Sequence, residues 1–260
     1  MATLSAKLHL GTSGWSYRDW LGPFYPHGTR PADYLRSYAR RFHTVEIDST
    51  FYRIPTEKSV RRWAESTPGG FLFCPKFPRI ITHDKRLVDC GKELTHFLRR
   101  MALLGPKLGP LVLQFDYTFT PDLLPRLQAF LSQLPGGFRY AVEIRNRKWH
   151  KVEPFFDLLE KHRCSLVLQD LYYMPPFFRF TAPFTYIRLL GNRGQIPEDF
   201  SRVRVERAQE LDDWARRVVE ILSEGLEVFA YSNNRYQGHA PETVRTLAAL
   251  VDRLLREKGA

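Results

Sequence analysis

The sequence predicts a (β/α)8 barrel of the TIM type, an α/β fold that forms a single domain over residues 1–260. Eight short apolar runs of strand character each stop at a polar or charged residue, and helical periodicity fills most of the intervals between them. The length of 260 residues fits the roughly 250 residues typical of one such barrel, and no Ser/Gly/Pro-rich linker divides the chain.

The predicted strands leave room for an outer helix in most of the intervals. They span residues 7–11, 44–47, 71–76, 111–115, 140–144, 165–169, 185–189 and 227–232. The predicted helices span residues 31–42, 56–66, 90–104, 121–134, 152–161, 206–224 and 240–257. Pro31 suits a first helical turn, and Thr56 is a suitable N-cap. The proline-rich stretch 172–177 is too short for a regular helix, so the helix after strand six is irregular or missing.

Alternation within the strands assigns their polar residues to one face. Successive side chains point to opposite faces of a strand, and the face toward the helices must be apolar. The polar alternates then face the barrel axis at the C-terminal strand ends, where TIM barrels carry their functional groups. Parity is ambiguous on strands one and eight, so Asn233 rests on its position alone.

These polar alternates form a candidate site of mixed charge. The predicted catalytic residues are Glu46 and Glu143, which nearby cations would keep ionised and therefore suited to accept a proton. The predicted substrate-binding residues are three cations and two amides: Lys76, Arg145, Arg188, Gln114 and Asn233. The alternative is a self-neutralised polar plug at the barrel top, because buried ions also persist when they pair with each other. The position at the C-terminal strand ends favours function.

The loops after strands seven and eight are the usual phosphate-binding loops of such barrels. Here they supply glycine N–H groups and cations that suit an anion: Gly191, Arg193, Asn234 and Arg235. The alternative is that these residues only form turns. Among many loop aromatics, Trp15 and Tyr52 follow strands closely and are candidates to stack on a substrate, whereas most of the others are expected to pack the loops.

The composition indicates which kinds of partner and which compartment to expect. The net charge is +11, the pI is near 9.7, and 29 of the 39 basic residues are Arg. A basic surface attracts nucleic acids and anionic metabolites, but codon bias or thermal adaptation also raises the Arg content. The opening residues 1–11 have no signal-peptide character and no run is long enough to span a membrane, which predicts a cytoplasmic protein. The three cysteines have neither the even count nor the paired spacing of a disulfide framework.

No cofactor is predicted. No histidine pair has metal-ligand spacing, so no metal site is predicted, and the nearby cations oppose a Mg²⁺ bound by Glu46 and Glu143. Nucleotide-binding and nucleophile-elbow motifs are absent from the sequence.

Several segments in order along the chain resemble the blocks of one family. They are residues 11–17 (GTSGWSY), 24–26 (FYP), 45–52 (VEIDSTFY), 76–83 (KFPRIITH), 142–145 (VEIR) and the pair Asn233-Asn234. They resemble the YecE-like family, domain of unknown function seventy-two. The resemblance implies a TIM-type barrel of bacterial and archaeal cytoplasmic proteins without a settled activity, and it places seven of the candidate residues on the family's polar positions. The sequence departs from the family at Leu190 and Ser232, where a His and an aromatic residue are common.

The leading functional hypothesis is an enzyme, a hydrolase or isomerase, that acts on an anionic substrate by carboxylate acid/base chemistry. The substrate would carry phosphate or a sugar, and the two carboxylates are similar in placement to those of glycosidase barrels. The alternative is a nucleic-acid-binding barrel with little catalysis, and a degenerate scaffold is a third hypothesis. Thr82 and His83 lie in the loop 77–89, either as catalytic groups or as a loop cap. Substrate identity, oligomeric state and a lid role for this loop are left open.

Overall fold

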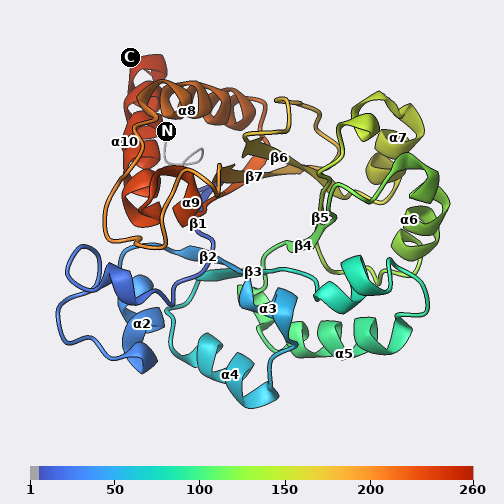
Figure 1. Ribbon diagram of the computed structural model, residues 1–260, viewed down its shortest axis with the longest axis horizontal. Coiled ribbons are helices and arrows are strands. Elements are labelled where there is room, and N and C mark those ends of the chain that lie inside the picture. The colour runs from blue at the N-terminus through green and yellow to red at the C-terminus, as the bar shows by residue number, and fades with distance from the viewer. Residues whose placement is uncertain (1–5, 260) are drawn as a thin grey trace. The chain divides into compact units, whose positions relative to one another are not determined.

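The computed structural model describes residues 6–259, in which strands alternate with helices along most of the chain (Figure 1). Residues 1–5, part of the opening segment judged to lack a signal peptide, lie outside the described residues. The strands are β1 (Leu8–Thr12), β2 (Thr44–Ile47), β3 (Leu72–Pro75), β4 (Leu111–Gln114), β5 (Tyr140–Glu143), β6 (Ser165–Leu171), β7 (Phe184–Gly191) and β8 (Glu227–Ser232). Each matches a predicted strand, with ends that differ by at most two residues.

The α-helices fill most of the predicted intervals. They are α2 (Tyr34–Tyr38), α3 (Ser49–Tyr52), α4 (Glu57–Glu65), α5 (Gly91–Ala102), α6 (Leu124–Leu131), α7 (Glu153–Lys161), α8 (Ala208–Ser223), α9 (Asn234–Gln237) and α10 (Ala240–Gly259). No helix separates β6 from β7, where the proline-rich stretch lies. None of the helices within residues 6–259 is both long and apolar enough to cross a membrane.

The prediction of a closed (β/α)8 TIM barrel is wrong. The strands of the described residues form one six-stranded sheet, in the order β1-β8-β7-β6-β5-β4, and a separate two-stranded sheet of β2 and β3. The β1–β8, β7–β8, β4–β5 and β5–β6 pairs are parallel, as consecutive strand–helix units require. The number and order of the strands were therefore predictable, but closure of the ladder was not.

Two local features explain why β2 and β3 do not continue the larger sheet. Between β1 and β2, the hydroxyl of Tyr38 replaces a backbone ladder: it accepts from Thr12 N at 3.0 Å and donates to Thr44 O at 2.9 Å. On the other side, the β3 and β4 segments meet through isolated bridges, Phe73 with Leu108 and Lys76 with Val112. Pro75 lies between those bridges and has no N–H to donate to a ladder.

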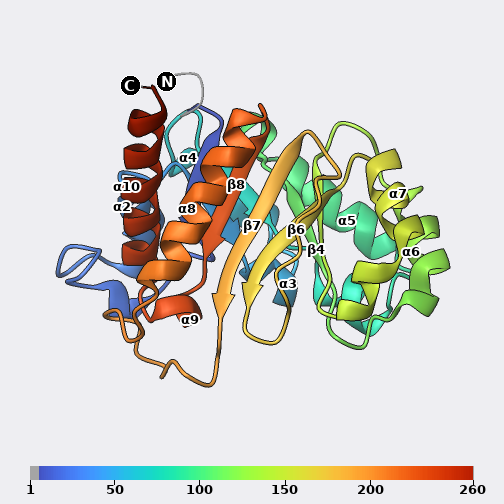
Figure 2. The same cartoon turned by 90° about the horizontal axis from the view of Figure 1, so that it is seen from above.

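Contacts between residues divide the chain into two compact units. The number of domains is not decided by this division, and the single domain stays a prediction. Unit 1 comprises residues 1–45, 169–173 and 184–260, and unit 2 comprises residues 46–168 and 174–183. In unit 1, β8 lies between β1 and β7, and α8 and α10 pack side by side over them (Figure 2). Leu211, Val218 and Leu222 of α8 are buried in this core.

Thr56 is the N-cap that the sequence predicts. Its hydroxyl accepts a hydrogen bond from Ser59 N at 3.2 Å at the start of α4. We expect Thr56→Ala to lower the free energy of unfolding by about 1 kcal/mol, because it leaves this N–H without its cap. Urea denaturation of the variant beside Thr56→Ser, which keeps the hydroxyl, measures the effect; equal losses in both variants would contradict it.

Candidate functional site

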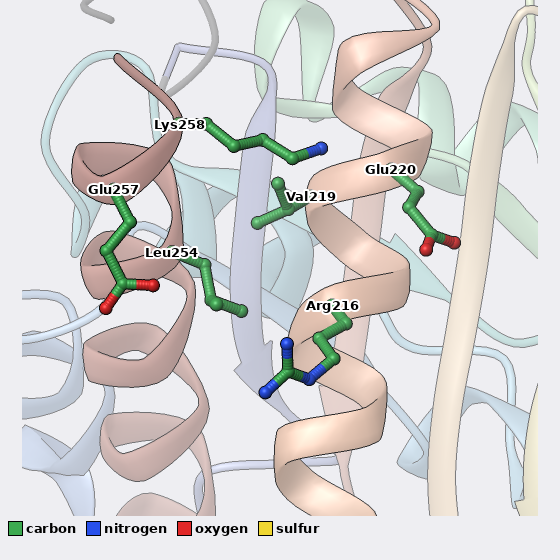
Figure 3. A pocket seen from close by; sticks show the side chains of 6 residues that line it. All are labelled: Arg216, Val219, Glu220, Leu254, Glu257 and Lys258. Carbon is green, nitrogen blue, oxygen red and sulfur yellow. The ribbon is translucent and has the colours of Figure 1, made fainter. Parts of the chain in front are cut away.

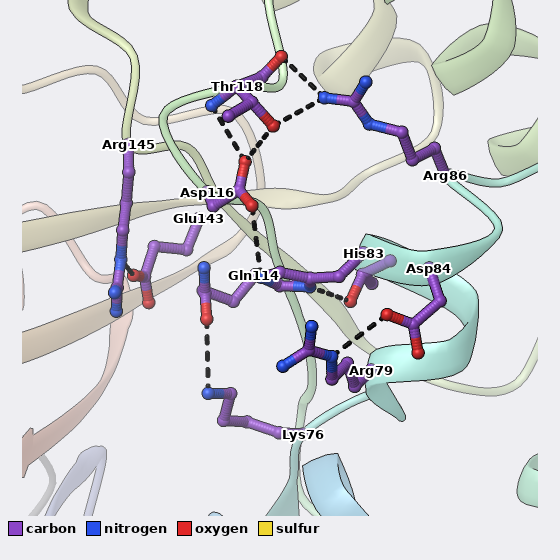
Figure 4. Close-up of polar contacts among 11 residues, drawn as sticks. Lys76, Arg79, His83, Asp84, Arg86, Gln114, Asp116, Thr118, Glu143 and Arg145 are labelled. Carbon is purple, nitrogen blue, oxygen red and sulfur yellow. Dashed lines mark hydrogen bonds and ion pairs between the residues drawn. The ribbon is translucent and has the colours of Figure 1, made fainter.

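The ends of β3, β4 and β5 bring four of the predicted residues onto one face of unit 2. Gln114 on β4 is in register with Glu143 on β5, and neighbours in register on parallel strands point to the same side. Lys76 forms an isolated bridge with Val112, two residues before Gln114 and therefore on the same face. Lys76, Gln114, Glu143 and Arg145, with His83 and Asp116 described below, form what we call the polar cluster (Figure 4).

Glu143 and Arg145 form the tightest ion pair of the polar cluster. The Oε1 atom of Glu143 accepts from Nε of Arg145 at 2.7 Å, and the Glu143 side chain is 0% exposed, whereas that of Arg145 is 25% exposed. The side chain of Arg145 makes no other hydrogen bond with the described residues. The guanidinium is thus anchored through Nε, and its Nη1 and Nη2 edge is available for a ligand.

Lys76 is buried beside Gln114, Asp48 and Phe51. Its Nζ atom lies 3.4 Å from Oε1 of Gln114, 3.5 Å from Oδ1 of Asp48 and 4.4 Å from the centre of the Phe51 ring. Because the amide oxygen of Gln114 faces this cation, its Nε2 donor is directed elsewhere, and Nε2 makes no hydrogen bond with the described residues. Gln114 is 5% exposed, so this donor belongs to a buried side chain.

Glu46 is fully buried on β2, in the two-stranded sheet. Its predicted partner Glu143 lies on β5 of the six-stranded sheet. The likeness to the carboxylate pairs of glycosidase barrels assumed a closed barrel with a fixed number of strands between the pair, and it loses its basis here.

His83 joins the polar cluster, although its residue type and position in the loop 77–89 did not distinguish a catalytic group from a loop cap. The residue lies in a π-helical turn, Ile80–Asp84, directly after β3. Its Nδ1 atom is 2.8 Å from Thr82 Oγ1, its Nε2 atom is 4.0 Å from Asp116 Oδ2, and its ring meets the edge of Phe51. Asp116 follows β4, and Figure 4 shows its carboxylate directed at the imidazole. A π-helical turn marks functional sites often enough to have been a signal, but the sequence alone does not reveal one.

Opposed effects act on the pKa values of this pair. Burial lowers the pKa of His83, with smaller effects from Lys76 and Arg145, while Asp116 opposes the change. For Asp116, burial raises the pKa, but hydrogen bonds from Thr118 outweigh it and the pKa lies below its ordinary value. His83 is therefore neutral and Asp116 ionised at neutral pH.

The remaining predicted residues belong to unit 1, except for Tyr52. Arg188 is 2% exposed on β7, in register with Tyr231 of β8. Asn233 is the N-cap of α9, and its Oδ1 accepts from Arg235 N at 2.9 Å, so part of its polar capacity is already used. Trp15 is half-buried, and Tyr52 of unit 2 is 79% exposed.

The predicted phosphate-binding residues are largely occupied by the protein itself. Oδ1 of Asn234 accepts from Trp20 Nε1 and from Ala240 N. Arg235 donates to Ile196 O and pairs with Glu198 Oε1 at 2.9 Å. Arg193 is exposed, and Gly191 packs closely against the backbone of α9. These contacts fasten the two loops to each other, which favours the turn interpretation over the anion site.

A surface pocket of about 320 Å³ lies between α8 and α10 (Figure 3). It is lined by Arg216, Val219, Glu220, Leu254, Glu257 and Lys258. Its charged rim is already paired on the surface: Arg216 with Asp212 and Glu220 with Arg217, both at 2.8 Å. No predicted site residue lines it. Among residues 6–259, no group of three or more His, Cys, Asp or Glu side chains is arranged to hold a metal ion.

Four histidines with lowered pKa values, of which His239 is buried and His83 and His150 are half-buried, predict a dependence of stability on pH. Burial lowers the pKa of His43, His83, His150 and His239 below the ordinary value of 6.5. The unfolded chain therefore binds more protons as the pH falls through 6.5, and the free energy of unfolding decreases until the folded histidines also protonate. Urea unfolding at pH 7.5, 6.5 and 5.5 should show this loss, and His83→Gln should reduce it. A stability that is unchanged or rises on acidification in this window would refute the prediction.

Comparison with known proteins defines the class. The family model described as "Protein of unknown function DUF72" matches residues 9–258. The chain therefore belongs to the DUF72 family, which confirms the resemblance seen in the sequence.

Individual relatives are similar over part or nearly all of the chain. The chain is 40% identical to UPF0759 protein YecE of Escherichia coli (strain K12) over 139 residues, which cover 54% of the chain and 48% of YecE, so it spans about half the length of this relative in that match. It is 25% identical to UPF0759 protein YunF of Bacillus subtilis, in a match that covers 94% of the chain and 95% of YunF. A crystal structure of a DUF72 family protein from Thermotoga maritima has a TM-score of 0.79 at 26% identity, covering 94% of this chain and 99% of that one. Another, from Enterococcus faecalis, has a TM-score of 0.77 at 24% identity and covers 94% of this chain and 95% of that one. This second likeness shows the fold alone.

Proposed function

We propose that this protein is an enzyme that binds an anionic substrate, phosphate-bearing or sugar-containing, at the polar cluster of unit 2 and transfers a proton there. The observation that carries the proposal is Arg145. It is three-quarters buried and held through Nε by a fully buried glutamate, with its Nη edge left for a ligand. A guanidinium fixed in this way matches the two oxygens of a carboxylate or phosphate group.

Two more groups support an anion at this position. The Nε2 donor of Gln114 belongs to a buried side chain on the strand next to Arg145, and the ammonium of Lys76 lies 3.4 Å from the same amide. Donors of this kind, preorganised in a site of low dielectric constant, stabilise negative charge better than they would in water. Lys76, Gln114 and Arg145 are therefore the proposed substrate-binding residues.

The geometry changes the role proposed for one carboxylate. Glu143 is committed to Arg145 at 2.7 Å, so we assign it the anchoring of the guanidinium rather than proton transfer. Glu46 lies outside the polar cluster as defined, on the two-stranded sheet, and its role in proton transfer stays a prediction. The binding roles of Arg188, Asn233, Trp15 and Tyr52 remain predictions.

The test is a thermal-shift screen of phosphorylated sugars, nucleotides, sugar acids and short oligonucleotides. A ligand bound only by the native state raises the melting temperature, so each variant is compared with its own unliganded midpoint. We expect a small anion to stabilise the wild type and Arg61→Met but not Arg145→Met. Arg61 is the matched control because it is an exposed arginine of unit 2 paired with Glu57 at 2.8 Å. A screen in which no anion stabilises the protein, or in which Arg145→Met responds like the wild type, would overturn the proposal.

A further inference from the structure

We propose that His83 is the residue that takes up the proton at the polar cluster, and that Asp116 is its positioning residue. This inference deepens the proposed function, because the proton would come from a hydroxyl of the bound anion. It also removes the need for a buried carboxylate to act as the base.

The two ring nitrogens of His83 have different surroundings. Nδ1 lies 2.8 Å from Oγ1 of Thr82, which is 3% exposed and fixed by its backbone bond to Pro78 O. Nε2 lies 4.0 Å from Asp116, beyond hydrogen-bond distance. When Nδ1–H donates to Thr82, the lone pair of Nε2 is the site that accepts a proton. The His83 side chain is 14% exposed, so part of the ring reaches the surface.

Asp116 is itself held in place. Its Oδ1 atom accepts from Thr118 N at 2.8 Å and from Thr118 Oγ1 at 2.6 Å, which leaves Oδ2 for the imidazole. Arg86 in turn donates from Nη2 to the carbonyl oxygen of Thr118 at 2.7 Å and to its Oγ1 at 2.6 Å (Figure 4). The chain of contacts Arg86–Thr118–Asp116 therefore directs one carboxylate oxygen toward Nε2.

The backbone that follows His83 and includes Arg86 is strained. Three non-glycine residues just after the π-helical turn have left-handed backbone angles: Arg86 (φ 47°), Leu87 (φ 69°) and Asp89 (φ 47°). Each costs roughly 1–2 kcal/mol, and such strain persists where surrounding contacts impose it, often at functional sites. Here the contacts include Leu87 N to Ile81 O at 2.9 Å and Arg86 to Thr118. These contacts hold the segment between His83 and Asp89 in its strained conformation.

The proton step follows from this geometry. The O–H bond of the ligand breaks, its electron pair stays on oxygen, and the proton forms a bond to Nε2 of His83. Asp116 stabilises the resulting imidazolium, while Lys76 and Arg145 stabilise the oxyanion. Arg79, which pairs with Asp84 at 3.0 Å, also lowers the pKa of His83 by its positive charge. General-base catalysis of this kind contributes about 10²- to 10⁴-fold to a rate.

Long-range ¹H–¹⁵N spectra of histidine-labelled protein test the pair without any substrate. We expect neutral His83 to carry its proton on Nδ1 and to titrate below the ordinary pKa of 6.5, and Asp116→Asn to lower that pKa further. Asp122→Asn is the matched control, because Asp122 is an exposed aspartate of the same segment that accepts from Thr120. A proton on Nε2 of neutral His83, or an unchanged pKa in Asp116→Asn, would overturn the proposal.

Inorganic phosphate separates this inference from the proposed function. Phosphate bound beside Lys76 and Arg145 should raise the pKa of His83 in the wild type but not in Arg145→Met. If phosphate changes nothing while Asp116→Asn lowers the pKa, the His83–Asp116 pair stands and the anion site fails. With a turned-over substrate, His83→Gln should lose at least about 100-fold in turnover and keep the ligand-induced thermal shift; turnover within tenfold of the wild type would refute His83 as the proton carrier.

Discussion

Gly191→Ala is expected to unfold at a markedly lower temperature than the wild type. A Cβ atom at this position would lie 2.6 Å from Arg235 O and 2.7 Å from Tyr236 Cα, and both of these are backbone atoms that cannot move aside alone. Gly191 also has φ +65°, which an L side chain adopts at a cost of about 1 kcal/mol. Overpacking adds a similar or larger amount, so we expect a total loss of ~3 kcal/mol.

Gly28 provides the control for Gly191. It has φ +81°, but a Cβ atom there would meet nothing within 4 Å. Gly28→Ala therefore carries the conformational cost without the clash, and should lose only about 1 kcal/mol. Calorimetry of both variants should show a difference in Tm of several degrees, at roughly 2–4 °C per kcal/mol for a chain of this size. Equal losses would mean that Gly191 is required only for its backbone angle.

The second large effect is expected at the Glu143–Arg145 pair. Arg145→Met leaves the carboxylate of Glu143, which is 0% exposed, without the guanidinium 2.7 Å away. Removing one partner of a buried hydrogen-bonded charge pair costs more than the pair contributes, so we expect a loss of about 2–3 kcal/mol. The double variant Glu143→Leu/Arg145→Met removes the buried charge as well and should recover most of that loss.

Urea denaturation of the single and double variants at pH 7.5 measures this coupling. Arg61→Met is again the control, because its partner Glu57 is exposed and surface pairs contribute about 0–1 kcal/mol. A double variant that is less stable than Arg145→Met would show that the Glu143 carboxylate is stabilised mainly by groups other than Arg145.

Local features of the fold were accessible from the sequence. Strand positions follow from short apolar runs, and the N-cap at Thr56 from its place before an amphipathic helix. Alternation along β4 and β5 placed Gln114 and Glu143 on one face because the period of a strand is two. Closure of the barrel was not accessible, because it depends on pairing at two edges. At one edge the hydroxyl of Tyr38 takes the place of backbone hydrogen bonds, and at the other Pro75 has no N–H to donate. The hydrophobic pattern of the sequence does not indicate either feature.

The candidate site was predictable only in part, for a related reason. Residues on strands have directions that parity fixes, so Lys76 and Gln114 could be assigned to one face. His83 lies in a π-helical turn and Asp116 just beyond β4, where no period applies, so their approach depends on the tertiary structure. Asn234 and Arg235 looked suited to phosphate by residue type, but their contacts with Trp20 and Glu198 could not be read from the sequence.

The central claim is that the polar cluster binds an anion through Arg145 and Gln114. The most direct measurement is a titration of inorganic phosphate into ¹⁵N-labelled protein at constant ionic strength, followed at the side-chain Nε of Arg145 and Nε2 of Gln114. We expect both resonances to shift and saturate together, with no such change when chloride replaces phosphate or in the backbone amide of Arg61. Resonances that stay fixed, or that shift without saturation and equally with chloride, would contradict the claim.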